Sequence, residues 1–307
     1  RSVGLSVAPH KSSAIFLTGR KKFPSVSIRI DGEPIVQVKT AKYLGFQLDS
    51  ALTGSAHISY VADKATRAAS ALARIMPKCR GVNDFRRKSL AAVADSILLY
   101  AAPIWNRLTE KATIRRQLNK VQRQVCLRAA RLNRTISVAA AQVISGRLPY
   151  DLRVRVLVSN QKERAADRRA YRNMNEAFEP ADEGDMFTEE HAVEEWQNRW
   201  GSTQEGQPGF WTRLVLPDIQ PWRDREHGSL TYPLAQMLSA HGSFGAYLHR
   251  IGRLESPICV LCMAATDDAR HTFEDCPNLA HIRNTFVRSS KDFVPPVSRV
   301  HAIRSGT

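Results

Sequence analysis

The stretch that most constrains the fold runs from residue 259 to residue 276 and reads CVLCMAATDDARHTFEDC. Its soft ligands follow the pattern C-x2-C-x8-H-x4-C and are Cys259, Cys262, His271 and Cys276. Two cysteines at this separation let a tight turn direct both thiolates at one point, and the second pair can return from about one turn of helix. The spacing therefore predicts a small knuckle that holds one tetrahedral Zn2+.

Two alternatives to this ligand set remain open at the level of sequence. His281 lies five residues beyond Cys276 and is an alternative fourth ligand, although we favour Cys276. A disulfide is the other alternative, but the chain has five cysteines and no apolar signal segment at its N-terminus. These features favour a reducing compartment, nuclear or cytoplasmic, where clustered Cys and His bind metal more often than they oxidise.

Length and composition indicate a folded protein with no membrane span. The chain has 307 residues, of which 43% are hydrophobic, an ordinary share for one large or two modest domains. The richest apolar patch, SILLYAAPIW at residues 96–105, contains a proline. It is also far shorter than the roughly 20 apolar residues that cross a bilayer.

The charge balance predicts a polyanionic partner. Lys and Arg number 45 against 29 Asp and Glu, which gives a net charge of +16 and a pI near 10.1. Such a balance attracts nucleic acid through counterion release, although a ribosomal or acidic membrane surface would fit the same charge. The imbalance is steepest from Arg107 to Arg172, with 17 basic and four acidic residues. We expect this region to contact RNA or DNA, because it would otherwise repel itself.

The first fifty residues have the pattern of a small antiparallel sheet. Val26, Ile28 and Ile30 alternate with polar residues before Asp31-Gly32, a hairpin turn signal. Residues 42–49 are predicted to form a last strand. Its Gly45 marks either a close approach to the backbone or a bulge.

From Ser55 the apolar period changes to that of helices. We expect one helix up to Pro77 and a second from about Asp84, whose buried stripe would be Leu90, Val93, Ile97 and Tyr100. A third helix carries basic residues on its other faces: Arg115, Arg116, Lys120, Arg123, Arg128 and Arg131.

Composition divides the rest of the chain. Nine acidic residues and no basic one lie between Glu176 and Glu195, which predicts a linker. Four tryptophans follow, and we expect them to pack a small irregular core rather than stack on bases. The predicted divisions are 1–50 (strands), 51–174 (basic helices), 175–195 (linker), 196–255 (Trp-rich connector), 256–285 (knuckle) and 286–307 (basic flexible tail).

Several motifs, taken in order, resemble the reverse transcriptase polyprotein of non-LTR, LINE-type retrotransposons, especially the insect type-1 elements that insert into ribosomal RNA genes. GLSVAPHK (4–11) followed by AIFLTG (14–19) looks like the family's fourth palm motif. KYLGF (42–46) looks like the primer grip that follows it. QMLSAHGSFGAYLH (236–249) is similar to the helix ahead of the family's Cys-Cys-His-Cys knuckle.

This resemblance implies a fold class and an origin. Residues 1 to about 50 would be the end of a polymerase palm, the basic helices the thumb and connection, and the knuckle a nucleic-acid grip. The expected fold is mainly α, with a small antiparallel β subdomain at the N-terminus and a small zinc knuckle at the C-terminus. Because the chain starts at Arg1 rather than Met, we also expect it to be a fragment.

The resemblance also assigns roles to single residues. Lys11 would approach the phosphates of the incoming nucleotide, although a turn lysine before a strand is an equal alternative. Tyr43, Leu44 and Gly45 would support the primer end. The template or primer phosphates would be contacted by Arg115, Arg116, Lys120 and Arg123.

No catalytic residue is expected in this chain. Polymerase chemistry needs paired carboxylates that hold two Mg2+ ions, and the one adjacent Asp pair, Asp267-Asp268, lies inside the zinc loop, where we expect it to be solvated. Mg2+ and an endonuclease would belong to the full-length polyprotein. The expected function is therefore to grip an RNA template and a DNA primer or target for RNA-directed DNA synthesis. The alternative is a stand-alone basic zinc-knuckle protein that binds RNA or DNA.

Overall fold

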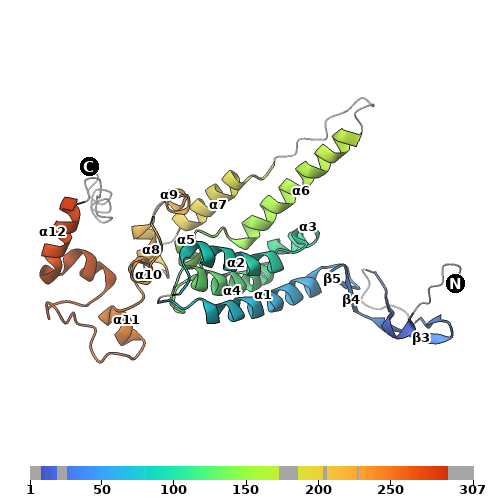
Figure 1. Ribbon diagram of the computed structural model, residues 1–307, viewed down its shortest axis with the longest axis horizontal. Coiled ribbons are helices and arrows are strands. Elements are labelled where there is room, and N and C mark those ends of the chain that lie inside the picture. The colour runs from blue at the N-terminus through green and yellow to red at the C-terminus, as the bar shows by residue number, and fades with distance from the viewer. Residues whose placement is uncertain are drawn as a thin grey trace.

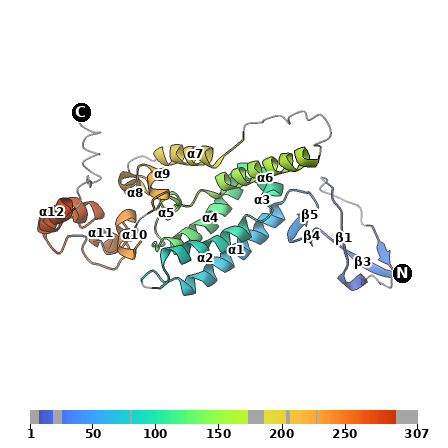
Figure 2. The ribbon, with the colours of Figure 1, turned by 45° about the horizontal axis from the view of Figure 1, so that its top comes forward.

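The computed structural model describes residues 8–18, 26–79, 81–172, 186–202, 206–226 and 228–289. The molecule is elongated, with small sheets at one end, a helical body in the middle and a Cys/His cluster at the other end (Figures 1 and 2). It is mostly helical, as predicted. The first residues of the motif at 4–11, Gly19 and most of the expected tail at 286–307 lie outside the described residues.

The N-terminal strands form two sheets. In the first, β3 (Glu33–Val38) pairs with β2 (Ile28–Ile30) in antiparallel and with β1 (Ser13–Ile15) in parallel orientation. The predicted hairpin turn is confirmed, because Asp31 and Gly32 both have positive φ between β2 and β3. A 3-10 turn, η1 (Pro9–Lys11), precedes β1.

The stretch 42–49 is two strands, so the prediction of a single strand is wrong. β4 (Thr40–Tyr43) and β5 (Phe46–Asp49) form an antiparallel hairpin in which Tyr43 pairs with Phe46. Leu44 has φ 45° and Gly45 has φ 84°. Two consecutive positive φ values are typical of a tight two-residue hairpin turn, and glycine takes them without strain.

The helical body begins with α1 (Ser55–Ile75), α2 (Asp84–Leu98) and α4 (Ala112–Ala129), which pack together. Ala69, Ala91, Ala94 and Val125 form a buried cluster between them. The short α3 (Ala102–Trp105) and η2 (Asn106–Glu110) connect α2 to α4. Small side chains let the three helix axes approach closely, so this part of the core is built on alanine.

The buried face of α2 differs from the predicted one. Its buried residues are Arg87, Ala91, Ala94 and Leu98, whereas Val93 and Tyr100 of the predicted stripe are exposed. The predicted stripe consisted of the large apolar residues. The buried face instead contains small residues, because only these fit where α2 packs closely against α1 and α4.

Another core joins six further helices: α5 (Val138–Ser145), α6 (Tyr150–Arg172), α7 (Glu189–Gly201), α8 (Phe210–Val215), α9 (Ile219–Arg223) and α10 (Tyr232–Ser239). Trp196 and Trp200 are buried in it, as predicted. They pack in the same cluster as Ile144 and Leu152, so these tryptophans belong to the helical body and form no separate irregular core.

Helix α7 begins inside the stretch that was expected to be a linker. Thr188 caps its N-terminus, and Glu189 lies in its first turn. Two of its acidic residues pair with the basic helix α6: Glu189 is bonded to Arg153 at 3.0 Å and Glu195 is bonded to Arg155. Glu189 and Glu195 therefore neutralise part of the basic region. Residues 173–185, which include the first half of the expected linker (175–195), are outside the described part of the chain.

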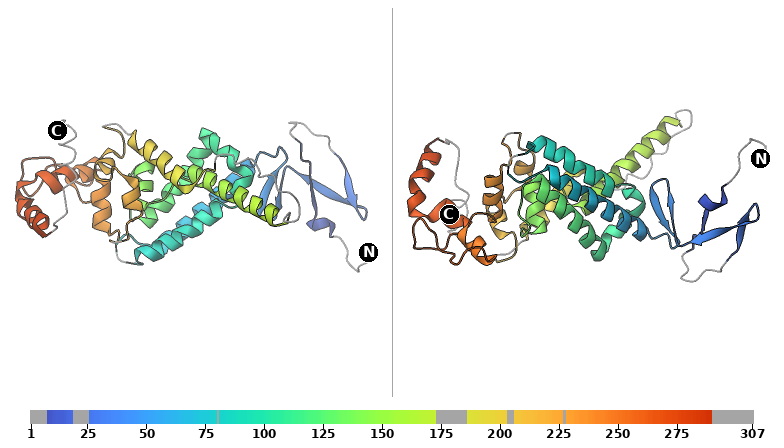
Figure 3. Two further views of the ribbon diagram at one scale, coloured as in Figure 1. Left: turned by 90° about the horizontal axis from the view of Figure 1, so that it is seen from above. Right: turned by 60° about the horizontal axis from the view of Figure 1, so that its bottom comes forward.

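After α10 the chain enters the Cys/His cluster through α11 (Gly245–Arg250). The cluster ends in a π-helical turn (His271–Asp275), a 3-10 turn (Pro277–Leu279) and α12 (Ala280–Ser289). The strands and this cluster lie at opposite ends of the molecule in each view (Figure 3). None of the helices in the described ranges is long and apolar enough to cross a bilayer.

A candidate metal centre and a basic groove

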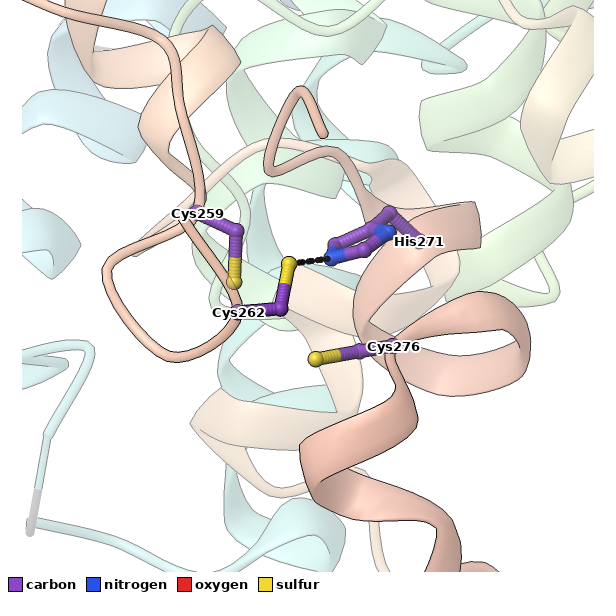
Figure 4. Close-up of side chains that lie close together, drawn as sticks. All are labelled: Cys259, Cys262, His271 and Cys276. Carbon is purple, nitrogen blue, oxygen red and sulfur yellow. Dashed lines mark hydrogen bonds between the residues drawn. The ribbon is translucent and has the colours of Figure 1, made fainter. Parts of the chain in front are cut away.

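The four predicted zinc ligands come together in one cluster. The ligand atoms of Cys259, Cys262, His271 and Cys276 all lie within 4.8 Å of one another. The side chains point at a common centre, two from one loop and two from the turn that faces it (Figure 4). Cys259, His271 and Cys276 are buried. This group could hold a metal ion, and the donor set fits one with an affinity for thiolate and imidazole.

Local backbone bonds bring the first two cysteines together. The Cys259 N–H donates to Ala265 O at 2.8 Å, and the Met263 N–H donates to Cys259 O at 2.9 Å. An isolated bridge between Ile258 and Thr266 closes the loop. Met263 takes a positive φ of 55°, which turns the chain sharply after Cys262. The two-residue gap between the cysteines is thus spanned by a tight turn, as predicted.

The H-x4-C half of the pattern corresponds to a π-helical turn. The Cys276 N–H donates to His271 O at 2.7 Å, a bond that spans five residues. Such a turn is wider by one residue than an α-helical turn. It places His271 and Cys276 on one side, which explains why four residues can separate these two ligands.

The surroundings of the thiols differ. The pKa of Cys262 is lowered to about 7, first by the backbone N–H of Ala264 and then by other hydrogen bonds, including one from His271. Its Sγ lies 3.3 Å from His271 Nε2. Burial raises the pKa of Cys276. Since the thiolate is the form that ligates metal, the surroundings of Cys262 favour that form more than those of Cys276 do.

His281 is not part of the cluster. It is exposed on α12, and the group of converging ligand atoms contains Cys276 in its place. Four protein ligands complete a tetrahedral shell, so the arrangement suits a structural ion and provides no open position for substrate.

Asp267 and Asp268 organise this cluster. The prediction of a solvated loop is wrong for Asp267, which is half-buried, whereas Asp268 is exposed, as predicted. The Gly245 N–H donates to Asp267 Oδ2 at 2.7 Å, and the Thr272 hydroxyl donates to Asp267 Oδ1 at 2.7 Å. The His271 N–H donates to Asp268 Oδ1 at 2.7 Å. A carboxylate three residues before a ligand histidine is a capping signal that the sequence contained. The partnership of Asp267 with Gly245 spans 22 residues and left no local signal.

We expect Asp267→Ala to weaken metal binding by about 10- to 100-fold, because the carboxylate positions both α11 and the ligand-bearing turn. Competition with a chromogenic zinc chelator would measure the affinity. The matched control is Glu255→Ala, which removes the same charge from an exposed position near Cys259. Equal affinities of the two variants would contradict a supporting role for Asp267.

A groove along α4 gathers the predicted phosphate contacts. Arg115, Arg116, Lys120 and Arg123 line it together with five uncharged residues: Ala112, Thr113, Gln117, Asn119 and Val138. Arg115, Arg116 and Lys120 are exposed. The guanidinium of Arg123 is already hydrogen-bonded to the backbone: its Nε donates to Ile136 O at 3.1 Å and its Nη2 donates to the same oxygen at 3.0 Å.

Other arginines of the basic region also bond inside the chain. Arg131 donates to Lys78 O at 2.8 Å, and Arg147 pairs with Asp95. Arg153 and Arg155 pair with α7 as described above. The count of basic residues in the sequence therefore overstates how much positive charge the surface offers.

The remaining predicted residues lie near the strand end. Lys11 ends η1 and is exposed. Tyr43 and Leu44 are 63% and 77% exposed at the tip of the β4–β5 hairpin. Tyr100, which was predicted to lie in the stripe of the second helix and not beside this turn, donates its hydroxyl to Leu44 O at 2.6 Å. A Cβ at Gly45 would lie 3.1 Å from the Tyr100 hydroxyl, so this position favours glycine for its space as well as for its φ.

Similarity to known proteins points to one class of polyprotein. The chain is 26% identical over 301 residues to a 115 kDa protein in a retrotransposable element of Drosophila melanogaster, and 25% identical over 277 residues to a retrovirus-related Pol polyprotein of Bradysia coprophila. A Pol polyprotein of Nasonia vitripennis is 26% identical over 292 residues. These matches cover 92%, 84% and 87% of the chain. The chain is thus homologous to a region of retrotransposon Pol polyproteins.

The elements in question are the type-1 retrotransposable elements R1, which confirms the resemblance inferred from the motifs. The chain spans 28% and 26% of the length of the Drosophila and Bradysia relatives, and 81% of the Nasonia one. No family model matches the chain. No solved structure matches it either.

Proposed function

We propose that this chain is the nucleic-acid-gripping C-terminal part of an RNA-directed DNA polymerase of a non-LTR retrotransposon. In this proposal, the strands and the β4–β5 hairpin are the end of the palm with its primer grip, and the helical body is the thumb and connection. The Cys/His cluster is a zinc knuckle. RNA template and DNA primer or target are the partners. The similarity to retrotransposon Pol polyproteins supports a reverse transcriptase-related chain, and the groove along α4 supports the grip.

The roles proposed for the basic residues of α4 are supported by their exposure, whereas those of Lys11, Tyr43, Leu44 and Gly45 rest on the family resemblance. Arg115, Arg116 and Lys120 project from one face of α4 into an open groove, where guanidinium and ammonium groups can contact phosphate oxygens. Arg123 would act mainly by fixing the wall of that groove, because its guanidinium bonds to Ile136 O. Tyr43, Leu44 and Gly45 would support the primer end, and Lys11 would approach the nucleotide phosphates.

The proposed zinc site is structural. Cys259, Cys262, His271 and Cys276 would hold the ion, which would tie the loop that carries Cys259 and Cys262 to the turn that carries His271 and Cys276. Polymerase chemistry, with its two Mg2+ ions, is assigned in this proposal to another part of the polyprotein. A stand-alone zinc-knuckle protein would not require the strands or the exposed hairpin, so we favour the polymerase reading.

The α4 groove carries this proposal, and charge removal tests it. We expect replacement of Arg115, Arg116 and Lys120 by Ala to weaken binding to RNA and DNA irrespective of sequence. The slope of log affinity against log salt should flatten by roughly one per lost phosphate contact. Fluorescence anisotropy over a salt series would measure both effects.

The matched control removes three exposed cations from α6, namely Lys162, Arg164 and Arg168. It changes the net charge equally, so it reports the effect of charge alone. The proposed grip would be refuted if the α4 and α6 triple variants gave the same affinity and the same salt slope.

A further inference from the structure

A pocket of about 670 Å3 lies where the helical body meets the Cys/His cluster. Its walls come from α8, α10, α11 and the segment 135–137 that precedes α5. This volume is within the range of about 300–1,000 Å3 that small-molecule ligands occupy. The side chains that matter here are Thr135, Phe210, Trp211, His241, Tyr247 and Arg250.

The polar wall of the pocket has a defined hydrogen-bond pattern. Arg250 Nη2 lies 3.2 Å from His241 Nε2, and a guanidinium can only donate, so Nε2 is the acceptor. The proton of the neutral ring is therefore on Nδ1, which donates to the Thr135 hydroxyl at 3.1 Å. The Tyr247 hydroxyl lies 2.9 Å from the same Thr135 oxygen.

The pocket has aromatic walls, with one cation, Arg250, at its edge and one exposed carboxylate, Asp268, in its lining. The His241 and Tyr247 rings stack with centroids 5.0 Å apart. Burial, followed by the Arg250 charge, lowers the pKa of His241 to about 4, so the imidazole stays neutral. Arg250 is exposed, with its guanidinium 5.4 Å from the centre of the Tyr247 ring. Flat π surfaces next to one accessible cation match a base and its phosphate.

The pocket is also connected to the basic groove. Thr135 lines the pocket, and the carbonyls on either side of it, at Arg134 and Ile136, both accept from Arg123 of the groove. Ser137 lines the pocket and the next residue, Val138, lines the groove. A single strand lying along α4 would therefore reach the pocket over one short, rigid segment.

We propose that this pocket binds one unpaired nucleotide of a single-stranded RNA or DNA, with the base between the aromatic walls and a phosphate at Arg250. A base within a duplex could not enter, because stacking and pairing hold it in the helix. The inference rests on the proposed function, since the groove has to hold the strand whose base enters the pocket.

The experiment compares oligonucleotides on the full chain. A single-stranded RNA of about 12 nucleotides should bind about tenfold more tightly than an abasic strand of the same length. This is about the gain in affinity that the stacking of one base provides. Photo-crosslinking of the same RNA with 4-thiouridine should label peptides that contain Phe210, Trp211 or Tyr247. Arg250→Ala should weaken binding more than Arg253→Ala, an exposed arginine that does not line the pocket.

The outcomes separate this inference from the function on which it rests. If the chain binds the RNA but treats the abasic strand equally, crosslinks elsewhere and responds equally to both arginine variants, the pocket proposal is overturned and the groove stands. If the chain fails to bind either strand, the proposed function itself has failed. Crosslinks in the pocket together with a difference between the Arg250 and Arg253 variants would establish the site.

Discussion

Removal of the metal is expected to unfold residues 256–285 while the helical body stays folded. The buried residues of this segment are Cys259, Ala269, His271 and Cys276, three of which are the proposed ligands. Its apolar side chains do not form a core, since Val260 is 80% exposed and Met263 is 74% exposed. Structural zinc contributes an apparent ~10–16 kcal/mol to small domains of this kind. Loss of the ion should therefore remove most of what orders the segment.

Metal analysis and proteolysis would check this expectation. We expect one zinc per chain, and we expect chelation to open cleavage sites confined to 256–285. Cys262→Ser should lower the zinc content, whereas Cys79→Ser, at an exposed cysteine outside the cluster, should not. A chain that contains no zinc, or a Cys262→Ser variant with unchanged zinc content, would refute the proposed metal centre.

The sequence predicted the cluster well because its ligands are close in the chain. Spacings of two, eight and four residues can be closed by local turns, so chemistry and distance are both visible in the sequence. The contact between Asp267 and Gly245 is of another kind. It joins the loop that carries Asp267 to the start of α11, and their relative position depends on tertiary packing. An Asp in a loop is as compatible with solvent as with a backbone donor.

Charge was the property that sequence analysis overstated. A sequence count treats every Arg as part of the surface, yet Arg87 is fully buried and Arg131 is bonded to a backbone carbonyl. The guanidinium has five donors in a fixed plane, which allows one arginine to satisfy several carbonyls at helix ends. The sequence around Arg87 does not distinguish it from Arg115, because its partners lie in the loop between α1 and α2 and at the distant end of α4.

Arg87→Met is expected to lower the free energy of unfolding of the helical body by about 3 kcal/mol, the cost of leaving several buried carbonyls without a donor. Arg87 is 0% exposed. Its Nη1 donates to Arg128 O at 2.8 Å at the end of α4, and its Nε donates to Val82 O at 3.2 Å before α2. A third bond, to Pro77 O, holds the chain after α1. One side chain thus joins the three helices around the alanine cluster.

Urea denaturation followed by circular dichroism would measure this effect. The control is Arg86→Met, the neighbouring exposed arginine, which should change stability by less than about 0.5 kcal/mol. Arg87→Lys should fall between the two, since an ammonium keeps the charge but cannot reach three carbonyls in one plane. If Arg87→Met were as stable as Arg86→Met, the three bonds would add nothing beyond what a methionine side chain supplies by packing. Residual stability in Arg87→Lys well above that of Arg87→Met would show that charge and donors, rather than side-chain volume, hold the ends of α1 and α4 to the start of α2.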